Sequence, residues 1–252
     1  MRYFMRLSYN GTGFSGWQVQ PREITVQGVL EDALSKVLRH PTGITGAGRT
    51  DTGVNARMMV AHFDHNGELP PSIVRSLNAM VGRNIAVEKI VRVADDAHAR
   101  FDAVQRTYHY YACTRKSPFI YPLTWQASPS LDFEAMNTAA ERLIGRKDFT
   151  SFSKLHTQVK TNICDLRAAR WDQCGPDIWC FTITADRFLR NMVRAVVGTL
   201  VEVGRGKLTP DGITRIIEKK DRCSAGTSMP AQALYLWDIR YPYLYDSDLI
   251  DF

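Results

Sequence analysis

The order of predicted strands and helices repeats once along the chain, and this repeat restricts the fold more than any other feature. Alternating apolar and polar residues predict strands, whereas apolar residues at i, i+3, i+4 and i+7 predict amphipathic helices. In the first half, these patterns predict strands at 2–9, 58–64 and 85–93, and helices at 26–38 and 71–80. In the second half, they predict strands at 105–114, 163–171, 177–185 and 234–240, and helices at 133–144 and 187–203.

Each half therefore approximates the β-α-β-β-α-β unit of ferredoxin-like domains. An added helix at 210–220 and a long connection at 116–132 are the exceptions. Because no low-complexity linker separates the halves, we expect them to share one sheet. The sequence thus predicts an α+β protein with two ferredoxin-like halves, 1–104 and 105–252, joined in one largely antiparallel mixed sheet.

Composition narrows the class of partner. The chain has 252 residues, a hydrophobic content of 44% and a net charge of +6, which favours polyanions such as nucleic acid. No apolar run approaches the roughly 18 residues of a membrane span, and the N-terminus lacks the features of a secretory signal, so we expect a cytoplasmic protein without membrane contact. The closest histidine pair, His62 and His65, lies on strand-like sequence without H-E-x-x-H, so no metal site is predicted.

The stretch "TGAGRTDTGVNA" at 45–56 holds three glycines and one carboxylate, Asp51. Its start, "GITGAGRT" at 43–50, nearly matches the phosphate-binding loop G-x-x-x-x-G-K-[ST], and Asp51-Thr52-Gly53 is the tripeptide of aspartic proteases. Asp51 could also be a nucleophile on a glycine-rich loop, or a structural residue that caps a turn.

The surrounding sequence does not fit a phosphate-binding loop or an aspartic protease. A phosphate-binding loop needs lysine where Arg49 stands, and Asp51-Thr52-Gly53 interrupts the helix that should follow. An aspartic protease needs two such aspartates, yet the chain has no second D-[ST]-G, and its long predicted helices contradict an all-β enzyme. A nucleophile and a structural turn remain open.

Eight motifs decide between them when they are taken in order. They are "YNGTGFSGWQVQP" (9–21), "TVQGVLEDAL" (25–34), "GAGRTDTGVNA" (46–56), "HARFDA" (98–103), "RTYHYY" (106–111), "DFTSF" (148–152), "FLRNMVRAVVGTLVEVG" (188–204) and "LYLWDIRYP" (234–242). Together they closely resemble the TruA-type tRNA pseudouridine synthases over essentially the whole chain.

The resemblance implies an isomerase that converts uridine to pseudouridine at positions 38, 39 and 40 of the tRNA anticodon stem-loop. It implies the pseudouridine synthase fold with a central active-site cleft, no cofactor and no metal. It also implies a homodimer with one tRNA across both subunits. The alternatives are a non-catalytic RNA-binding protein and a pseudouridine synthase acting on a different RNA.

The resemblance assigns roles to four residues. Asp51 matches the essential aspartate, which attacks C6 of the base or C1′ of the sugar or initiates elimination. Tyr108 matches the tyrosine that stacks on the target uracil, although an aromatic residue on an alternating strand is ordinarily part of the core. Arg194 matches the arginine that could pair with Asp51 and keep it ionised, although such arginines usually face water. Arg49 matches an arginine that contacts phosphate or fills the space of the flipped base, and could instead be a surface charge.

Two residues depart from the usual "RTDAGVHA" of the family, namely Thr52 and Asn55. Threonine adds bulk beside the aspartate, and asparagine replaces an imidazole, so we expect them to tune activity rather than abolish it. A uracil stacked in a stem must be extruded before it reacts, and phosphate contacts would offset that cost. The candidates for these contacts are Lys36, Arg39, Arg75, Arg187 and Arg190.

Overall fold

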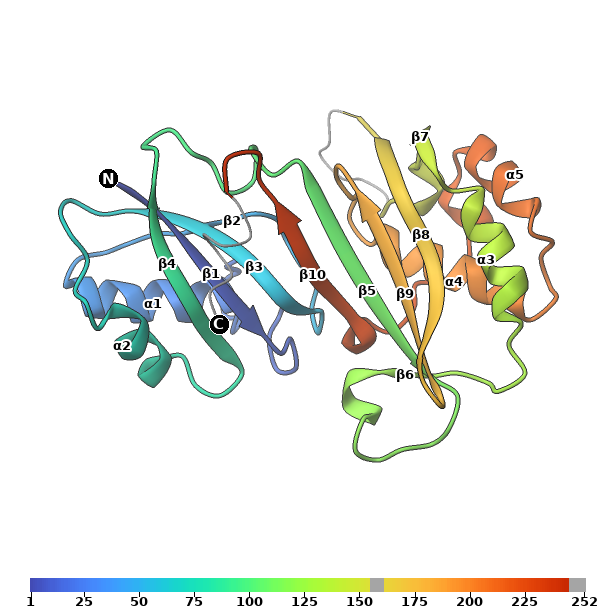
Figure 1. Ribbon diagram of the computed structural model, residues 1–252, viewed down its shortest axis with the longest axis horizontal. Helices are drawn as coiled ribbons and strands as arrows, with labels where there is room; N and C mark the ends of the chain where they lie inside the picture. Colours follow the sequence, from blue (N-terminus) through green and yellow to red (C-terminus); the bar gives the residue numbers. More distant parts are fainter. Residues whose placement is uncertain (155–160, 245–252) are drawn as a thin grey trace. The chain divides into compact units, whose positions relative to one another are not determined.

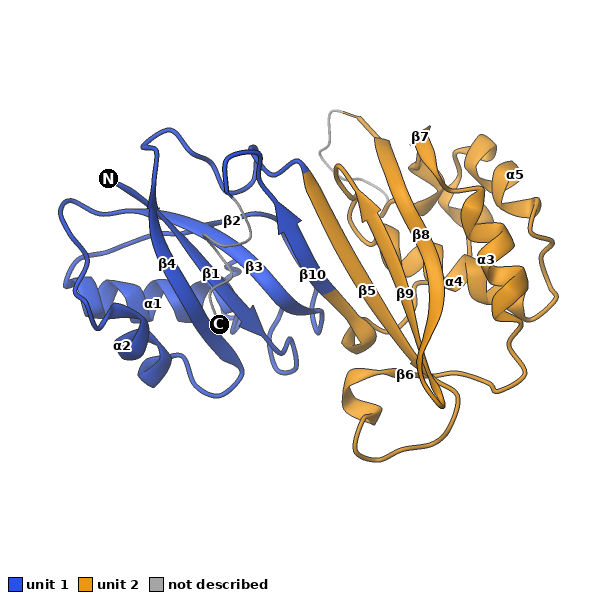
Figure 2. Cartoon of the chain, viewed as in Figure 1, with its two compact units in different colours: residues 1–104, 236–252 blue, residues 105–235 orange. Residues whose placement is uncertain are grey.

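The computed structural model describes residues 1–154 and 161–244, and the chain forms two compact units (Figure 2). Unit 1 contains residues 1–104 and the C-terminal segment from Leu236, and unit 2 contains residues 105–235. The chain from Leu236 onward thus belongs to unit 1, whereas the sequence alone assigned it to the second half.

Unit 1 begins with the strand-helix order expected of a ferredoxin-like half (Figure 1). Its elements are β1 (Arg2–Tyr9), α1 (Val26–Leu38), β2 (Thr45–Gly46), β3 (Asn55–Asp64), α2 (Ile73–Met80) and β4 (Ile85–Val93). Strand β1 lies between β4 and β3, and the short β2 pairs with Ala61 and His62 near the C-terminal end of β3. The two-residue β2 was not predicted, and it supplies the strand that completes β-α-β-β-α-β.

Strand β1 is buried more fully than its alternating sequence suggests. The five residues Tyr3–Leu7 are all buried, so both faces of β1 are covered, and β1 pairs with a strand on each side. Arg6, the charged member of this run, has its Nε 2.8 Å from the Glu88 carboxylate of β4. This ion pair allows a charged side chain to remain inside the sheet.

Unit 2 repeats the order with several additions (Figure 1). Its elements are β5 (Gln105–Cys113), β6 (Trp125–Gln126), α3 (Phe133–Glu141), β7 (Gly145–Asp148), β8 (Ile163–Gly175), β9 (Ile178–Ala185), α4 (Met192–Gly204) and α5 (Gly212–Lys219). The strand order is β5-β9-β8-β7, with β6 parallel to β5, and β10 (Leu234–Arg240) begins in unit 2 and continues into unit 1. The predicted α+β class with largely antiparallel strands is confirmed.

Helix α4 starts five residues later than predicted. The apolar pattern continued back to Arg187, but Asn191 has a φ of 65°, which an α-helix cannot contain. Asparagine is among the few residues that adopt this left-handed conformation readily. Arg187 and Arg190 consequently lie in the segment that leads into α4, and not on its face.

His62 on β3 makes unit 1 sensitive to pH. Its side chain is buried, its Nδ1 accepts the Ala99 N–H at 3.2 Å, and burial lowers its pKa to about 4, with the charges of Arg2 and His98 adding to the effect. An unfolded histidine has a pKa of about 6.5, so between these values the unfolded chain binds the extra proton.

We therefore expect the free energy of unfolding to fall by about 2 kcal/mol as the pH drops from 7 to 5 on account of His62 alone. Urea unfolding at both pH values would measure this change. In His62→Gln, which keeps an acceptor but does not titrate, the decrease should be smaller by that amount. An equal decrease in both proteins would contradict the assignment.

Candidate functional site

Asp51 lies in the connection between the short strand β2 and strand β3 in unit 1. Its side chain is half-buried, whereas Thr50 before it is buried and Thr52 after it is exposed. The N–H of Val54 donates to the carbonyl of Asp51 at 3.1 Å, which closes a four-residue turn. Gly53 has a φ of 76°, a conformation that glycine adopts without strain. The sequence therefore holds one carboxylate on a tight turn.

A second glycine-rich loop, at 10–17, packs directly against this turn. A Cβ at Gly16 would lie 2.6 Å from the Thr50 carbonyl oxygen, and a Cβ at Gly11 would lie 2.2 Å from the Val54 carbonyl oxygen. Both distances are too short for any side chain, so only glycine permits this approach. The motif at 9–21 thus supplies the backbone surface on which the Asp51 turn rests.

Hydrogen bonds fasten the two loops together on the N-terminal side of Asp51. The N–H of Trp17 donates to the Thr50 carbonyl at 3.1 Å, and the hydroxyls of Tyr9 and Thr50 lie 2.8 Å apart in a buried contact. The Trp17 ring also covers Gly46, where a Cβ would lie 2.6 Å from it. Thr50 is consequently fixed through both its backbone and its side chain.

Asn55 fastens the loops on the C-terminal side. Its Oδ1 accepts the N–H of Gly11 at 2.8 Å, and the residue is only 2% exposed. Thr52, the other departure from the usual pattern, is exposed at the outside of the turn. Of the two unusual residues, Asn55 therefore contributes to the architecture of the loop and Thr52 faces outward.

Arg49 is exposed and lies two residues before Asp51. Its exposure fits each of the roles left open by the sequence, namely a contact with phosphate, occupation of the space of the flipped base, or a plain surface charge. Arg57, on β3 beyond the turn, stacks its guanidinium 4.9 Å from the centre of the Trp237 ring within the same unit. Cationic groups are therefore present on both sides of the Asp51 turn along the chain.

Tyr108 lies on β5 of unit 2, opposite Ile183 of β9. It is half-buried, whereas Tyr110, two residues further along the same face, is fully buried. The ring of Tyr108 meets the ring of Phe188 edge-on, with centres 5.0 Å apart. The sequence left open whether Tyr108 is a core residue, and the structure assigns the fully buried position to Tyr110 instead.

Arg194 lies in the first turn of α4, and its side chain is half-buried. Its Nε donates to the carbonyl of Met229 at 2.5 Å, and its own carbonyl accepts the Met229 N–H at 3.2 Å. The neighbouring carbonyl, that of Pro230, accepts the Tyr110 hydroxyl at 3.1 Å. The segment 225–230, which we call the strap, thus fixes one edge of the Arg194 guanidinium.

Gly198, one turn after Arg194 on α4, is where the strap packs against this helix. A Cβ at Gly198 would lie 1.8 Å from the Thr227 carbonyl oxygen. A Cβ at Gly226 of the strap would lie 2.7 Å from the Gly198 carbonyl, and the Gly226 N–H donates to the Thr199 hydroxyl at 2.8 Å. Gly198 therefore lets the strap pack on α4, and it affects Arg194 through Met229.

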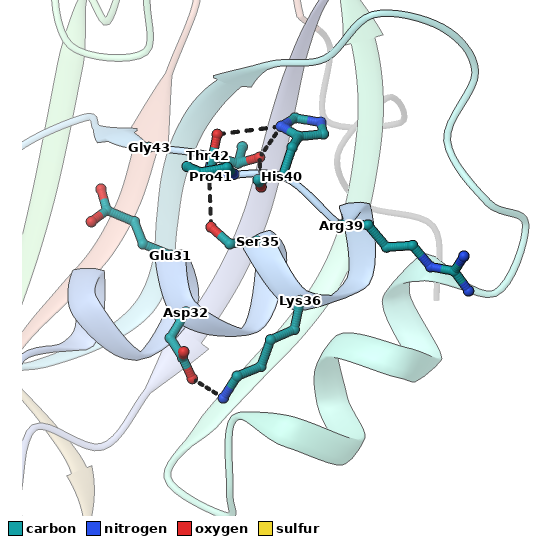
Figure 3. Close-up of a pocket in the computed structure, with 9 residues that line it drawn as sticks. All are labelled: Glu31, Asp32, Ser35, Lys36, Arg39, His40, Pro41, Thr42 and Gly43. Atoms are coloured by element: carbon teal, nitrogen blue, oxygen red, sulfur yellow. Dashed lines mark hydrogen bonds and ion pairs between the residues drawn. The ribbon is translucent and has the colours of Figure 1, made fainter.

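A surface pocket of about 580 Å³ lies elsewhere in unit 1, at the C-terminal end of α1 (Figure 3). Its polar lining is already engaged, since Lys36 pairs with Asp32 at 2.6 Å and Ser35 accepts the Thr42 N–H at 2.9 Å. The opposite end of α1 is the one that meets the glycine-rich loop, because the Val26 N–H donates to the Gly16 carbonyl. We assign this pocket no part in the chemistry of Asp51.

Two further observations concern metal sites and membrane-spanning helices. Within residues 1–154 and 161–244, no three His, Cys, Asp or Glu side chains gather as a metal site requires. In the same part of the chain, no helix is long and apolar enough to cross a membrane.

Comparison with known proteins gives a consistent result. A family model described as tRNA pseudouridine synthase matches residues 7–102 and 139–242. Proteins named tRNA pseudouridine synthase A from Parabacteroides distasonis and Bacteroides fragilis are 56% and 54% identical, with 96% of each chain covered. One of the same name from Porphyromonas gingivalis is 52% identical over 96% of this chain and 97% of its own. A solved Cbf5-Nop10-Gar1 complex has a chain with a TM-score of 0.35 and 10% identity, covering 79% of this chain and 54% of that one, a likeness too weak for inference.

Proposed function

Because the chain belongs to the tRNA pseudouridine synthase family and is an isomerase that acts on tRNA, we propose that it modifies uridines 38, 39 and 40 of the anticodon stem-loop, with Asp51 as the nucleophile. The observation that carries the proposal is the Asp51 turn, in which one half-buried carboxylate is held between two glycine-rich loops. A turn that served only as a chain reversal would not need its flanking residue Thr50 to be fixed at both backbone and side chain.

The reaction balances without a cofactor. The bond between N1 of uracil and C1′ of ribose breaks, and a bond between C5 and C1′ forms. C5 loses its proton to solvent, and N1 gains one, so the composition of the nucleotide is unchanged. No oxidant, reductant or phosphate donor enters this balance, and the demand on the protein is to hold the detached base and return it in a new orientation.

Asp51 provides the group that assists departure of the base. An ionised carboxylate can attack C1′ or C6, or can initiate elimination, and each route needs close approach of the oxygen to the nucleotide. Gly11 and Gly16 let the 10–17 loop pack against the turn, and Gly53 lets the turn close tightly, so the half-buried carboxylate is held on a fixed backbone. A carboxylate fixed before substrate arrives also avoids reorganisation during the reaction.

The other three predicted site residues act on the substrate and on Asp51. Tyr108, half-buried beside Phe188, stacks on the uracil ring and holds it while the glycosidic bond is open. Arg194 pairs with Asp51 through its Nη groups, since its Nε donates to Met229. Arg49, exposed beside the turn, contacts a backbone phosphate or occupies the space vacated by the flipped uridine.

We further propose that the protein works in the cytoplasm as a homodimer with one tRNA across both subunits, as in the family it belongs to. A net charge of +6 supports binding to a large polyanion. Sedimentation or light scattering of the purified protein, with and without tRNA, tests the dimer.

Binding of tRNA should depend strongly on salt. Each phosphate that is neutralised by a lysine or arginine releases condensed cations, so the slope of log K against log [salt] reports the number of contacts. We expect a slope of about −4 to −8 between 50 and 200 mM potassium chloride, measured by filter binding with an unmodified tRNA transcript. An affinity that is unchanged over this range would contradict recognition through phosphates.

The site of modification is tested with the same transcript. Purified protein should introduce pseudouridine at 38, 39 or 40, wherever the transcript carries uridine, and transcripts in which these uridines are replaced by cytidine should remain unmodified. Modification at positions outside the anticodon stem-loop would instead support the alternative of a different target within tRNA.

A further inference from the structure

We infer that Asn55 is a positioning residue for Asp51, which holds the C-terminal end of the Asp51 turn against the glycine-rich loop through its bond to Gly11. The inference rests on the proposed role of Asp51 and goes beyond it by assigning a role to a second residue. Asn55 is one of the two positions where this chain departs from the usual motif. Asn55, which occupies the position of the histidine in the usual motif, would fix the backbone of the Asp51 turn.

The argument begins with the ends of two strands. Strands β1 and β3 pair in register from Arg2↔Asp64 to Leu7↔Met59, and the register then shifts before Tyr9↔Ala56. Beyond that point the chains separate into the two glycine-rich loops. Gly11 lies two residues beyond Tyr9, and Asn55, the first residue of β3, directly precedes Ala56, so the Asn55 side chain continues the connection between the strands beyond the last regular pair.

The Gly11–Asn55 bond lies where the backbones of the two loops are in close contact. Gly11 is buried, and a Cβ there would lie 2.2 Å from the Val54 carbonyl oxygen. A backbone N–H at such a place needs an acceptor, because a buried donor without one is costly. Asn55 Oδ1 accepts it at 2.8 Å, from a residue that is only 2% exposed.

Asn55 reaches Asp51 in two steps. The bond to Gly11 fixes the backbone at residues 54 and 55, and the Val54 N–H in turn donates to the Asp51 carbonyl at 3.1 Å. On the other side, Thr50 is fixed by Trp17 and Tyr9. Asp51 is thus held at both ends of its turn, and loss of the Asn55 bond would release one end while the other stays fixed.

Such a release should change turnover and leave substrate binding nearly unaltered. Catalysis depends on the geometry of the attacking group, and a displacement of about 1 Å can cost about 100-fold in rate. Phosphate contacts dominate tRNA affinity, and Asn55 is a buried, uncharged residue that cannot supply one. We expect kcat of Asn55→Ala to fall about 10- to 100-fold with KM within about threefold of wild type.

The control is Asn78→Ala. Asn78 Oδ1 accepts the Val87 N–H at 2.8 Å, the same distance as in the Asn55 bond, and its Nδ2 donates to the Val87 carbonyl at 2.8 Å. This substitution therefore removes hydrogen bonds of the same kind within unit 1, from α2, away from the turn. It should lower Tm yet leave kcat unchanged. Comparison of Asn55→Ala with Asn78→Ala distinguishes an effect of lower stability from an effect of a displaced Asp51.

Asn55→His tests the hydrogen bond itself. An imidazole nitrogen can accept the Gly11 N–H, so the histidine variant should recover kcat to within about threefold of wild type. If Asn55→Ala does not fold, Asn55→Ser decides, because its hydroxyl is one bond too short to reach Gly11 and its kcat should fall as predicted for alanine.

The inference is overturned if Asn55→Ala or Asn55→Ser retains wild-type kcat, or if Asn78→Ala loses as much kcat as they do. It is also overturned if KM rises in place of a fall in kcat. These outcomes are distinct from failure of the proposed function, in which the wild-type protein forms no pseudouridine or Asp51→Asn remains active.

Discussion

Replacement of Asp51 by asparagine is expected to reduce pseudouridine formation at least about 10⁴-fold, while tRNA affinity stays within about threefold of wild type. Asparagine has nearly the same shape, and the hydrogen bond from Val54 is to the backbone carbonyl, so the turn should persist. What is lost is the charged oxygen that we propose assists departure of the base. A 10⁴-fold effect corresponds to about 5.4 kcal/mol of transition-state stabilisation.

Single-turnover release of tritium from tRNA labelled at C5 of uridine measures this directly, because the C5 proton leaves when the new bond forms. Asp32→Asn serves as a control, since Asp32 is an exposed carboxylate whose pairing with Lys36 contributes little. Substantial tritium release by the Asp51 variant, with product confirmed as pseudouridine, would refute nucleophilic catalysis by Asp51.

The second large effect is expected at Arg194. Arg194→Ala should lower kcat about 10³-fold and Arg194→Lys about 10²-fold, with tRNA affinity changed much less than turnover. Alanine removes the cation that we propose pairs with Asp51. Lysine retains the charge but lacks the planar group that can donate to Met229 and to a carboxylate at the same time.

Arg205→Ala provides the matched control at the other end of α4, where Arg205 pairs with Glu202 on the surface at 2.9 Å. Its kcat and KM should equal those of wild type. If Arg194→Ala turned over at the wild-type rate, Arg194 would not be a partner of Asp51. If it lost tRNA affinity and turnover in equal measure, Arg194 would be a binding residue instead.

The regular part of the fold could be predicted from the sequence because it depends on local periodicity. Helix α1 was predicted at its observed bounds, Val26–Leu38, where a capping threonine precedes a clear apolar face. Strands β1 and β4 were likewise predicted at their observed bounds. Strand β2 was missed, because two residues cannot show a period, and its pairing with β3 depends on a distant segment.

From the sequence, the candidate site could be predicted only as a set of residues, without the contacts that hold them in place. Asp51 was distinguished from a plain turn by its resemblance to a known motif, and not by any local property of the sequence. The residues that support it, Tyr9, Gly11, Trp17 and Asn55, were quoted within motifs but received no supporting role. Their bonds join positions about 40 residues apart, which a single sequence does not reveal.

The strap illustrates the same limit in unit 2. A glycine on a helix, such as Gly198, indicates that another segment packs closely against it. The sequence could not identify that segment as the one containing Thr227. The αL conformation of Asn191, which moved the start of α4, was equally hidden within an apolar pattern that continued through it.

The most direct test of the central claim is a map of pseudouridine in tRNA from cells that lack this protein, compared with the same cells carrying the wild-type protein or Asp51→Asn. We predict that pseudouridine at 38, 39 and 40 disappears without the protein, returns with the wild-type chain and stays absent with Asp51→Asn. An unchanged map in the cells that lack the protein, or restoration by Asp51→Asn, would contradict it.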